Sequence, residues 1–373
     1  MKTGKLPENV LKRSVLRQIH TGSETVQNGA GIGRDCAILA FSGKEGIAAS
    51  MQEGLVAAQG EAFTDPAASE PALTIGTLIQ RCANNLAAGG ARPSAAMVTL
   101  LLPERAQEAE VKALMAEAAE KCRELSMEIL GGQTRTTKGA DAVLAVVTGF
   151  GRMRGADPAD AVPKSGDSKE PPFGDGSRKG AVRGKRASLP GQDVVLSKWI
   201  GLEGTALLAK GNRARLLKRY PAYLVEEAEG FGRYLSIVPE AEIAADFGIG
   251  AMHDASEGGI LGALWELAEG AGVGLSIDMR KLPLRQETVE VCECCGVNPY
   301  ELLAGGCLIM TAQDGPGLAA ALEREGIPAA LVGKVTEGND RILINGDEIR
   351  YMDRPKRDGV YGFWESRDLL PRE

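Results

Sequence analysis

Residues 252–261 combine several reactive side chain types with a backbone that could hold a ligand. The stretch reads Met-His-Asp-Ala-Ser-Glu-Gly-Gly-Ile-Leu, and an apolar run with helical spacing follows it at once. This pattern predicts a loop that leads into the N-terminus of a helix. Unpaired backbone N–H groups at such a helix start attract an anion such as phosphate. The residues that could take part are His253, Asp254, Ser256, Glu257, Gly258 and Gly259.

The same stretch also has a purely structural interpretation. Asp254 or Ser256 could cap the predicted helix through a side-chain oxygen. His253 could be a buried histidine whose ring is hydrogen-bonded within the core. Taken alone, the stretch leaves the capping and the anion-binding interpretations open.

Three other stretches place polar side chains beside glycine-rich turns. In each, small residues leave the backbone open to a ligand, and the polar side chains offer oxygen or nitrogen atoms. Residues 28–39 contain Asp35, and residues 83–93 contain Asn84 and Asn85. Residues 129–136 contain Gln133 and Thr134 next to Gly132.

In this order, the four stretches resemble the aminoimidazole ribonucleotide (AIR) synthase superfamily, whose fold is called PurM-like. The superfamily includes purine-pathway cyclo-ligases, thiamine-phosphate kinases, selenophosphate synthetases and hydrogenase-maturation dehydratases. The resemblance is nearest to the hydrogenase-maturation branch and to AIR synthase-related proteins, and it spans about residues 5–345. It implies a two-domain fold: an N-terminal α+β domain whose sheet pairs with a second copy in a homodimer, and a C-terminal α/β domain. The nucleotide would lie in the cleft between them.

The resemblance also implies ATP and Mg²⁺ as cofactors. Asp35, Asn85 and Gln133 stand where relatives hold the metal, and Asn84, Gly132 and Thr134 would complete the nucleotide side. The Asp254–Gly259 loop would bind a second anion or the substrate.

The chain departs from its relatives at the metal positions. Relatives carry Asn-Asp where this chain has Asn84-Asn85 and aspartate where it has Gln133, and Gln52-Glu53 occupies a further such position. An amide oxygen can ligate Mg²⁺ but brings no charge, so these replacements should weaken a metal site. They also remove candidate general bases.

Residues 197–205 form a further candidate for the cleft. They read Ser-Lys-Trp-Ile-Gly-Leu-Glu-Gly-Thr and join a predicted strand to a predicted helix. In the resembled family the corresponding turn borders the second domain's side of the cleft, so Lys198 could face the ligand. A helix start with a packed Trp199 is the alternative, and the residues favour neither.

Three functions follow from these patterns. The first is an ATP-dependent enzyme that activates an oxygen, amide or carboxylate of a small-molecule substrate by phosphorylation. The second is a non-catalytic dimer that binds a nucleotide or metabolite, and the third is an accessory factor that docks with a metalloenzyme during maturation. Dehydratase chemistry on a C-terminal thiol is disfavoured, because the chain ends Leu-Leu-Pro-Arg-Glu and its last cysteine is Cys307.

Composition limits the class of protein. At 373 residues the chain can form about two domains. The net charge of −7 argues against nucleic acid or an anionic membrane as the main partner. No run of 18 apolar residues and no signal-peptide core is present, so we expect a cytoplasmic protein. The seven cysteines fit reduced, partly buried thiols better than a zinc site.

The elements that must position these residues follow from periodicity. We expect an N-terminal domain over 1–153, a Gly/Pro/Ser/Lys-rich loop over 154–190, a C-terminal domain over 191–350 and a tail over 351–373. Expected helices are 6–19, 74–88, 104–125, 203–211, 222–231, 239–247 and 257–269. Expected strands are 36–41, 46–51, 95–102, 126–130, 142–149, 193–198, 273–277, 307–311, 331–335 and 341–345.

Overall fold

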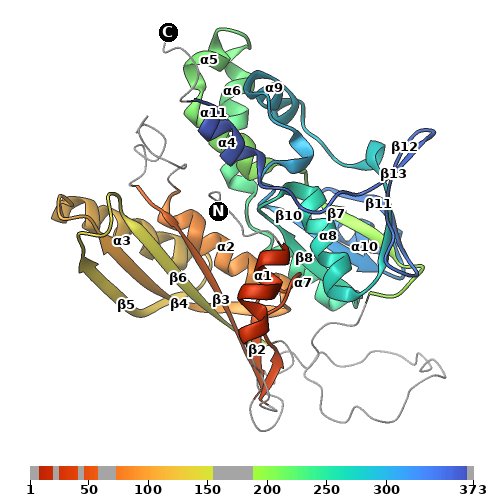
Figure 1. Cartoon of the computed structure of the whole chain (residues 1–373), viewed down its shortest axis with the longest axis horizontal. Coiled ribbons are helices and arrows are strands. Elements are labelled where there is room, and N and C mark those ends of the chain that lie inside the picture. The colour runs from red at the N-terminus through yellow and green to blue at the C-terminus, as the bar shows by residue number, and fades with distance from the viewer. Residues whose placement is uncertain (1–7, 20–24, 41–45, 58–72, 154–187, 368–373) are drawn as a thin grey trace.

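The computed structural model describes residues 8–19, 25–40, 46–57, 73–153 and 188–367. They form two sheets with their covering helices, one from the first half of the chain and one from the second (Figure 1). This confirms the expected two-domain fold of the AIR synthase type. The expected 154–190 loop lies outside the described residues except for its last three.

The first sheet has six strands in the order β1-β2-β3-β6-β4-β5. The strands are β1 (Val26–Asn28), β2 (Ala37–Ala40), β3 (Gly46–Leu55), β4 (Ala91–Leu102), β5 (Glu128–Thr136) and β6 (Leu144–Met153). All pairs are antiparallel except β4–β5, which α3 (Glu108–Glu124) connects, as a parallel pair requires. Helix α2 (Ile75–Ala88) and α3 cover one face of the sheet (Figure 1).

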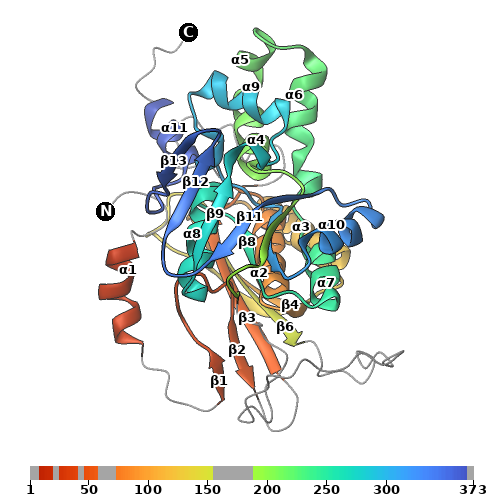
Figure 2. The ribbon, with the colours of Figure 1, turned by 90° about the vertical axis from the view of Figure 1, so that its right-hand side faces the viewer.

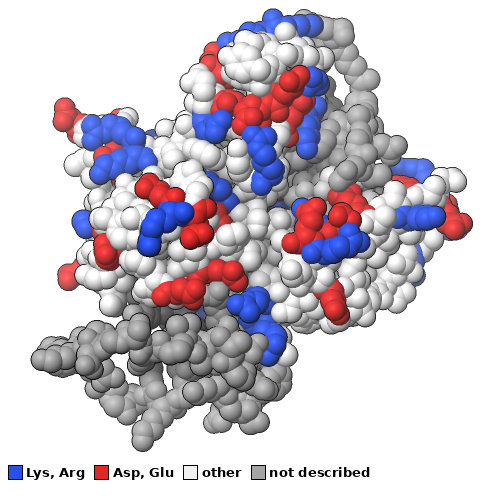
Figure 3. Space-filling model, turned by 180° about the vertical axis from the view of Figure 1, so that it is seen from behind, with Lys and Arg blue, Asp and Glu red and all other residues white. Residues whose placement is uncertain are grey.

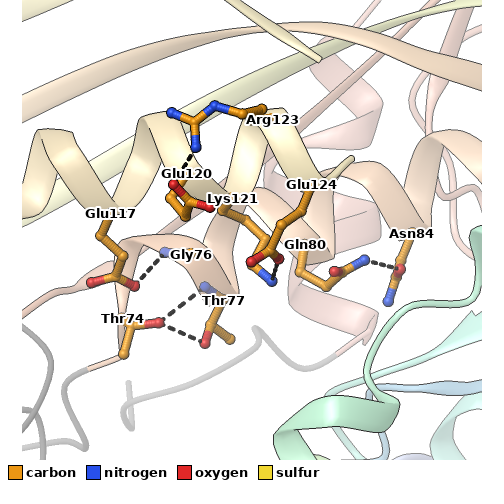
Figure 4. A network of polar contacts seen from close by, with 10 residues as sticks. All are labelled: Thr74, Gly76, Thr77, Gln80, Asn84, Glu117, Glu120, Lys121, Arg123 and Glu124. Atoms are coloured by element: carbon orange, nitrogen blue, oxygen red, sulfur yellow. Dashed lines mark hydrogen bonds and ion pairs between the residues drawn. The ribbon is translucent and has the colours of Figure 1, made fainter. Parts of the chain in front are cut away.

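Helix α2 is the buried centre of this domain. Its N-cap Thr74 accepts a hydrogen bond from the Thr77 N–H at 3.1 Å. The Gly76 N–H next to it donates to Glu117 of α3 at 3.0 Å, so the two helices share a polar contact at this end (Figure 4). Eleven of the 14 residues of α2 are buried, which fixes the helix between the sheet and the second domain.

The second sheet has seven strands in the order β13-β12-β9-β11-β7-β10-β8. They are β7 (Asp193–Ser197), β8 (Ala251–Ala255), β9 (Gly274–Asp278), β10 (Cys307–Ala312), β11 (Ala329–Thr336), β12 (Arg341–Asn345) and β13 (Glu348–Tyr351). Only β9–β12 is parallel, so this sheet is mixed. Helix α8 (Gly259–Ala271) packs on one face, and α7 (Val238–Phe247) and α10 (Gly315–Arg324) pack on the other (Figure 2). With both faces covered, β7 and β10 are buried almost throughout.

A group of helices extends from the second domain beyond its sheet (Figure 1). It consists of α4 (Leu202–Gly211), α5 (Arg213–Leu217), α6 (Ala222–Glu229), α9 (Gln286–Cys295) and α11 (Gly359–Arg367). Cys292 and Cys294 of α9 lie in its core, and all seven cysteines of the chain are free thiols, as expected. Burial raises the pKa of Cys292 to about 12, so this thiol is inert at neutral pH.

Short elements complete the chain. They are α1 (Glu8–Ser14) and the 3₁₀ turns η1 (Leu16–Gln18), η3 (Gly230–Tyr234), η4 (Met279–Lys281) and η5 (Pro299–Glu301). No helix among the described residues has the length and apolar character that a membrane span needs. On the face shown in Figure 3, acidic and basic side chains lie side by side, without one extended basic patch.

Three local expectations differ from the structure. Residues 252–255 belong to strand β8 instead of a loop, because β10 pairs with them. Residues 131–136 continue β5, where a turn was expected. Glycine is needed at position 132 for the close strand packing, because a Cβ there would lie 1.7 Å from the Val98 carbonyl oxygen. The expected tail is folded as far as residue 367, since α11 packs into the core.

Candidate functional site: a cleft between the two domains

A cleft of about 840 Å³ lies where the two domains meet. Its walls come from the glycine-rich turn 29–33, strand β3, helix α2, the β8–α8 junction and the start of α11. This volume lies in the range of pockets that bind small molecules and cofactors. Of the residues singled out from the sequence, those that line the cleft are Asp35, Gln52, Glu53, Asn85, His253, Asp254, Ser256 and Glu257.

Asp35 and His253 join the two domains at the cleft wall. The His253 Nδ1 lies 2.7 Å from Asp35 Oδ1, and both side chains are buried. The turn before Asp35 reaches this position because Gly33 has a φ of +67° and packs on α8. A Cβ at Gly33 would lie 2.0 Å from the Glu266 carbonyl oxygen, so only glycine allows this approach.

The second ring nitrogen of His253 is also engaged, because Nε2 lies 3.3 Å from Glu266 Oε2. Burial by itself lowers the pKa of His253, but the Asp35 and Glu266 carboxylates outweigh it and raise the pKa to about 9. The imidazole is therefore charged at neutral pH and holds two carboxylates from different elements. Because both of its ring nitrogens lie next to carboxylates, His253 positions the cleft wall.

Asp254 points into the same region from the next position of β8. Burial and the nearby Asp35 carboxylate raise the pKa of Asp254 well above its usual range, despite the opposing effect of His253. Its Oδ1 has no hydrogen-bond partner among the described residues, and neither has Asp35 Oδ2. These two buried oxygens leave hydrogen-bonding capacity unused beside the cleft, and a protonated Asp254 can donate a hydrogen bond.

A second charged bridge between the domains was not expected from the sequence. Arg81 of α2 donates from Nε to Glu203 Oε1 at 2.9 Å, and its Nη2 lies 2.8 Å from the same oxygen. Both side chains are nearly buried, and Arg81 lines the cleft. Arg81, the only charged residue of α2, was the available signal, because buried charges are normally paired or functional.

The adjacent residues Asn84 and Asn85 point in different directions. Asn84 is buried and lies outside the cleft; its Nδ2 donates to the Leu235 carbonyl at 2.8 Å, and its Oδ1 accepts from the Ile237 N–H at 3.1 Å. Gln80 also donates to Asn84 Oδ1 (Figure 4). Asn85 lines the cleft, where its Nδ2 donates to Ser50 Oγ at 3.1 Å. Asn84 thus joins the domains, and Asn85 alone faces the ligand space.

Two other groups of expected site residues do not reach the cleft within one chain. Gly132, Gln133 and Thr134 lie on β5, the strand at the far edge of the first sheet, and are exposed. Lys198 is buried, pairs with Glu240 and donates to the Tyr234 carbonyl at 2.9 Å. Its φ of +52° and these contacts show a structural role in the second domain.

The start of α8 differs from both interpretations of its sequence. The N-cap Gly258 makes no side-chain cap, so neither Asp254 nor Ser256 caps the helix. The position for an anion is also filled, because the Gly258 N–H donates to Asp358 Oδ2 at 2.8 Å. Gly258 lies outside the cleft lining, and Gly259 packs so closely on residues 300–301 that a Cβ would lie 2.6 Å from the Tyr300 carbonyl oxygen.

Comparison with known proteins agrees with this architecture. The model described as "AIR synthase related protein, N-terminal domain" matches residues 33–153, and that of the C-terminal domain matches residues 190–345. The chain belongs to the AIR synthase related family. Carbamoyl dehydratase HypE of Rhodobacter capsulatus is 32% identical to it over 258 residues, which are 67% of this chain and 66% of the relative.

Solved structures show the same fold as this AIR synthase related protein. Hydrogenase maturation protein HypE in complex with ATP has a TM-score of 0.63 and 17% identity, covering 95% of this chain and 96% of that one. HypE in a HypE–HypF complex also has a TM-score of 0.63, with 19% identity, covering 86% of this chain and 93% of that one.

The three expected Mg²⁺ ligands of this AIR synthase related chain do not meet within one chain. Asp35 and Asn85 both line the cleft, whereas Gln133 lies on the distant edge strand β5. In the part of the chain that the structure describes, no group of three His, Cys, Asp or Glu side chains could hold a metal ion. Mg²⁺ at this cleft would therefore depend on oxygens that the ligand or water supplies.

Proposed function

We propose that the chain binds ATP in the interdomain cleft and uses it to activate an oxygen-bearing group of a small-molecule substrate, in the maturation of a metalloenzyme. The observation that carries the proposal is the cleft itself, which both domains build through the buried Asp35–His253 contact. The glycine-rich turn 29–33 would let phosphates approach the backbone, and Arg34 and Arg81 would supply positive charge. The division into domains over 1–153 and 191–350 belongs to this proposal, and the ranges of the two family matches support it.

The known relatives support the same proposal. A HypE structure of the same fold was solved with ATP, and the relative at 32% identity is a carbamoyl dehydratase. ATP bound to this chain would supply a transferable phosphoryl group. The chain's own residues would bind the phosphates, orient the substrate against Asp254 and exclude water from the cleft.

A second candidate function is a non-catalytic nucleotide- or metabolite-binding dimer or maturation scaffold. The specific observation in its favour is that the expected metal ligands do not meet within the described residues. Without a resident metal, such a cleft would hold a ligand but transfer its phosphoryl group slowly.

Isothermal titration with ATP, with and without Mg²⁺, tests the proposal. We expect binding to the wild type and a loss of about tenfold in affinity for Arg34→Ala, which removes a cation at the cleft wall. Arg324→Ala is the matched control, because both arginines are exposed and donate to a backbone carbonyl, Arg34 to Gly29 at 3.1 Å and Arg324 to Ala320 at 3.2 Å. No binding in either condition would overturn the ATP proposal. Binding without turnover across a substrate screen would favour the scaffold.

The proposal includes a homodimer formed by the uncovered face of the first sheet. This face carries exposed apolar side chains, with Met51 59% exposed, Met97 41% and Leu130 63%. Met51 and Met97 both lie opposite Thr148 of β6 in the ladder, so they form a continuous row on one face. Exposed apolar patches of this kind mark association surfaces. We expect Met51→Lys to shift the chain from dimer to monomer in light scattering, and an unchanged mass would contradict this interface.

A maturation partner and a cytoplasmic location complete the proposal. A HypE chain of the same fold occurs in a complex with HypF, and the free cysteines suit a reducing compartment. Affinity purification from cells that express a hydrogenase-type metalloenzyme tests this part. Retention of a maturation protein or enzyme subunit by the wild type, and its loss at high salt, is the expected result; purification of the chain alone would contradict it.

A further inference from the structure

The segment after β13 returns to the cleft and is fixed there. Residues 352–358 lead from the edge of the second sheet to α11, whose Val360, Phe363 and Trp364 are buried in the core. The Trp364 ring lies against Gly211 of α4, where a Cβ would be 3.4 Å from it, and Figure 1 shows α11 beside α4. Asp358, Val360 and Tyr361 line the cleft, so this segment is part of its wall.

Asp358 is the centre of this wall. Its Oδ2 accepts a hydrogen bond from the Gly258 N–H at 2.8 Å, and its Oδ1 accepts one from the Val360 N–H at 3.0 Å. The residue is 4% exposed. Helix α8 has no side-chain cap of its own, so this carboxylate, 100 positions away in sequence, takes the place of a cap. A carboxylate at the positive end of a 13-residue helix is a favourable arrangement.

A second carboxylate lies beside the first. The Tyr361 hydroxyl donates to Glu257 Oε1 at 2.7 Å, and Glu257 lines the cleft together with Asp358. The α8 end of the cleft therefore carries two acidic side chains held by α11 and the helix start. The glycine-rich turn, which packs on α8 through Gly33, carries Arg34. The cleft lining carries charges of both signs, and Asp358 and Glu257 place negative charge beside the start of α8.

We propose that Asp358 is a specificity-determining residue, a built-in anion that keeps phosphate groups away from the N-terminus of α8. A phosphate-bearing ligand must then place its phosphates elsewhere in the cleft, where Arg34 and Arg81 lie, and its neutral or cationic part toward the start of α8. Asp358 both fills the N–H groups that a phosphate would use and repels a second anion. The inference concerns any anionic ligand, so it does not depend on ATP being the ligand.

The test replaces Asp358 and supplies inorganic phosphate. In Asp358→Ala, the Gly258 and Val360 N–H groups lose their acceptor, and phosphate can bind in its place. We expect the melting temperature of this variant to rise with phosphate concentration, but not with chloride at equal ionic strength. In calorimetry its affinity for phosphate should exceed that of the wild type by at least about tenfold. The wild type should show a smaller phosphate-specific shift than the variant.

Asp353→Ala is the matched control, because Asp353 belongs to the same segment but its side chain is 79% exposed and pairs only with Lys356 at 3.1 Å. It should respond to phosphate as the wild type does. If Asp358→Ala does not fold, Asp358→Ser enters the same titration, since its hydroxyl can still accept from the Gly258 N–H. A folded Asp358 variant that gains no phosphate binding, or a wild type that is stabilised by phosphate equally well, would overturn the proposal.

Discussion

Two chemically different kinds of contact join the two domains. Near the cleft, the contacts are ionic: His253 lies between Asp35 and Glu266, and Arg81 pairs with Glu203. Farther along α2 the contact is neutral, because the Asn84 amide binds the backbone of residues 235 and 237. Loss or neutralisation of one partner of a buried charge pair strongly lowers the free energy of unfolding, whereas an amide contact does not respond to pH. The difference predicts which interdomain contact is sensitive to pH and which is not.

Breaking the ionic contact should have the largest effect. Asp35→Ala leaves the His253 imidazolium buried with one carboxylate less, and we expect a loss of about 3–5 kcal/mol in the free energy of unfolding at pH 7. Urea denaturation measures this loss, and Asp347→Ala in the exposed β12–β13 turn is the control. A loss below about 1 kcal/mol would mean that the pair contributes no more than a surface ion pair.

The same contact should make stability depend on pH. The folded pKa of His253, about 9, lies above its ordinary value of 6.5. Its stabilising contribution is therefore complete below about pH 6.5 and is lost as the pH rises through about 9, by on the order of 3 kcal/mol. Thermal unfolding of the wild type and His253→Gln between pH 6 and 10 measures this. Parallel curves for the two proteins would show that His253 is not the titrating group.

The neutral contact should cost less to break and should not titrate. Asn84→Ala leaves the Ile237 N–H and the Leu235 carbonyl without their partner, so we expect a loss of about 1–3 kcal/mol. Urea denaturation at pH 6.5 and pH 9.5 should give the same loss for this variant. A loss that changes with pH would remove the distinction between the two contacts.

Substitution of the neighbouring Asn85 should have the smallest effect, and it separates the roles of the two asparagines. Asn85 lines the cleft, so Asn85→Ala should weaken ATP binding by about three- to tenfold, with little change in stability. Asn84→Ala should leave ATP affinity nearly unchanged. Titration calorimetry of both variants compares them directly, and the reverse order would place Asn84, rather than Asn85, against the ligand.

The sequence predicted the architecture and part of the site for definite physical reasons. Helical spacing marked α2 and α3, and short apolar runs marked the buried strands, because burial on one or both faces leaves a periodic signal. Asp35, Asn85 and the 253–257 stretch were expected near a ligand, and the structure places all of them at the cleft.

Other features depend on contacts that are distant in sequence. The Asp358 cap of α8 spans 100 positions, and the Arg81–Glu203 pair spans 122, so no local pattern indicates either. Asn84 and Asn85 are alike in the sequence, but the turn of about 100° between adjacent helix positions sends one to the interface and the other to the cleft. Gln133 was assigned through the resemblance, while its position on edge strand β5 follows from the sheet order.

Hydrogen–deuterium exchange with and without ATP tests the central claim, that the ligand binds in the interdomain cleft, most directly. The account predicts slower exchange on ATP addition at residues 29–36, in the turn that carries Asp35, and at residues 253–257 at the end of β8. The Arg34→Ala variant should show less protection at both. ATP binding that protects only segments outside the cleft, or that protects neither wall, would contradict the account.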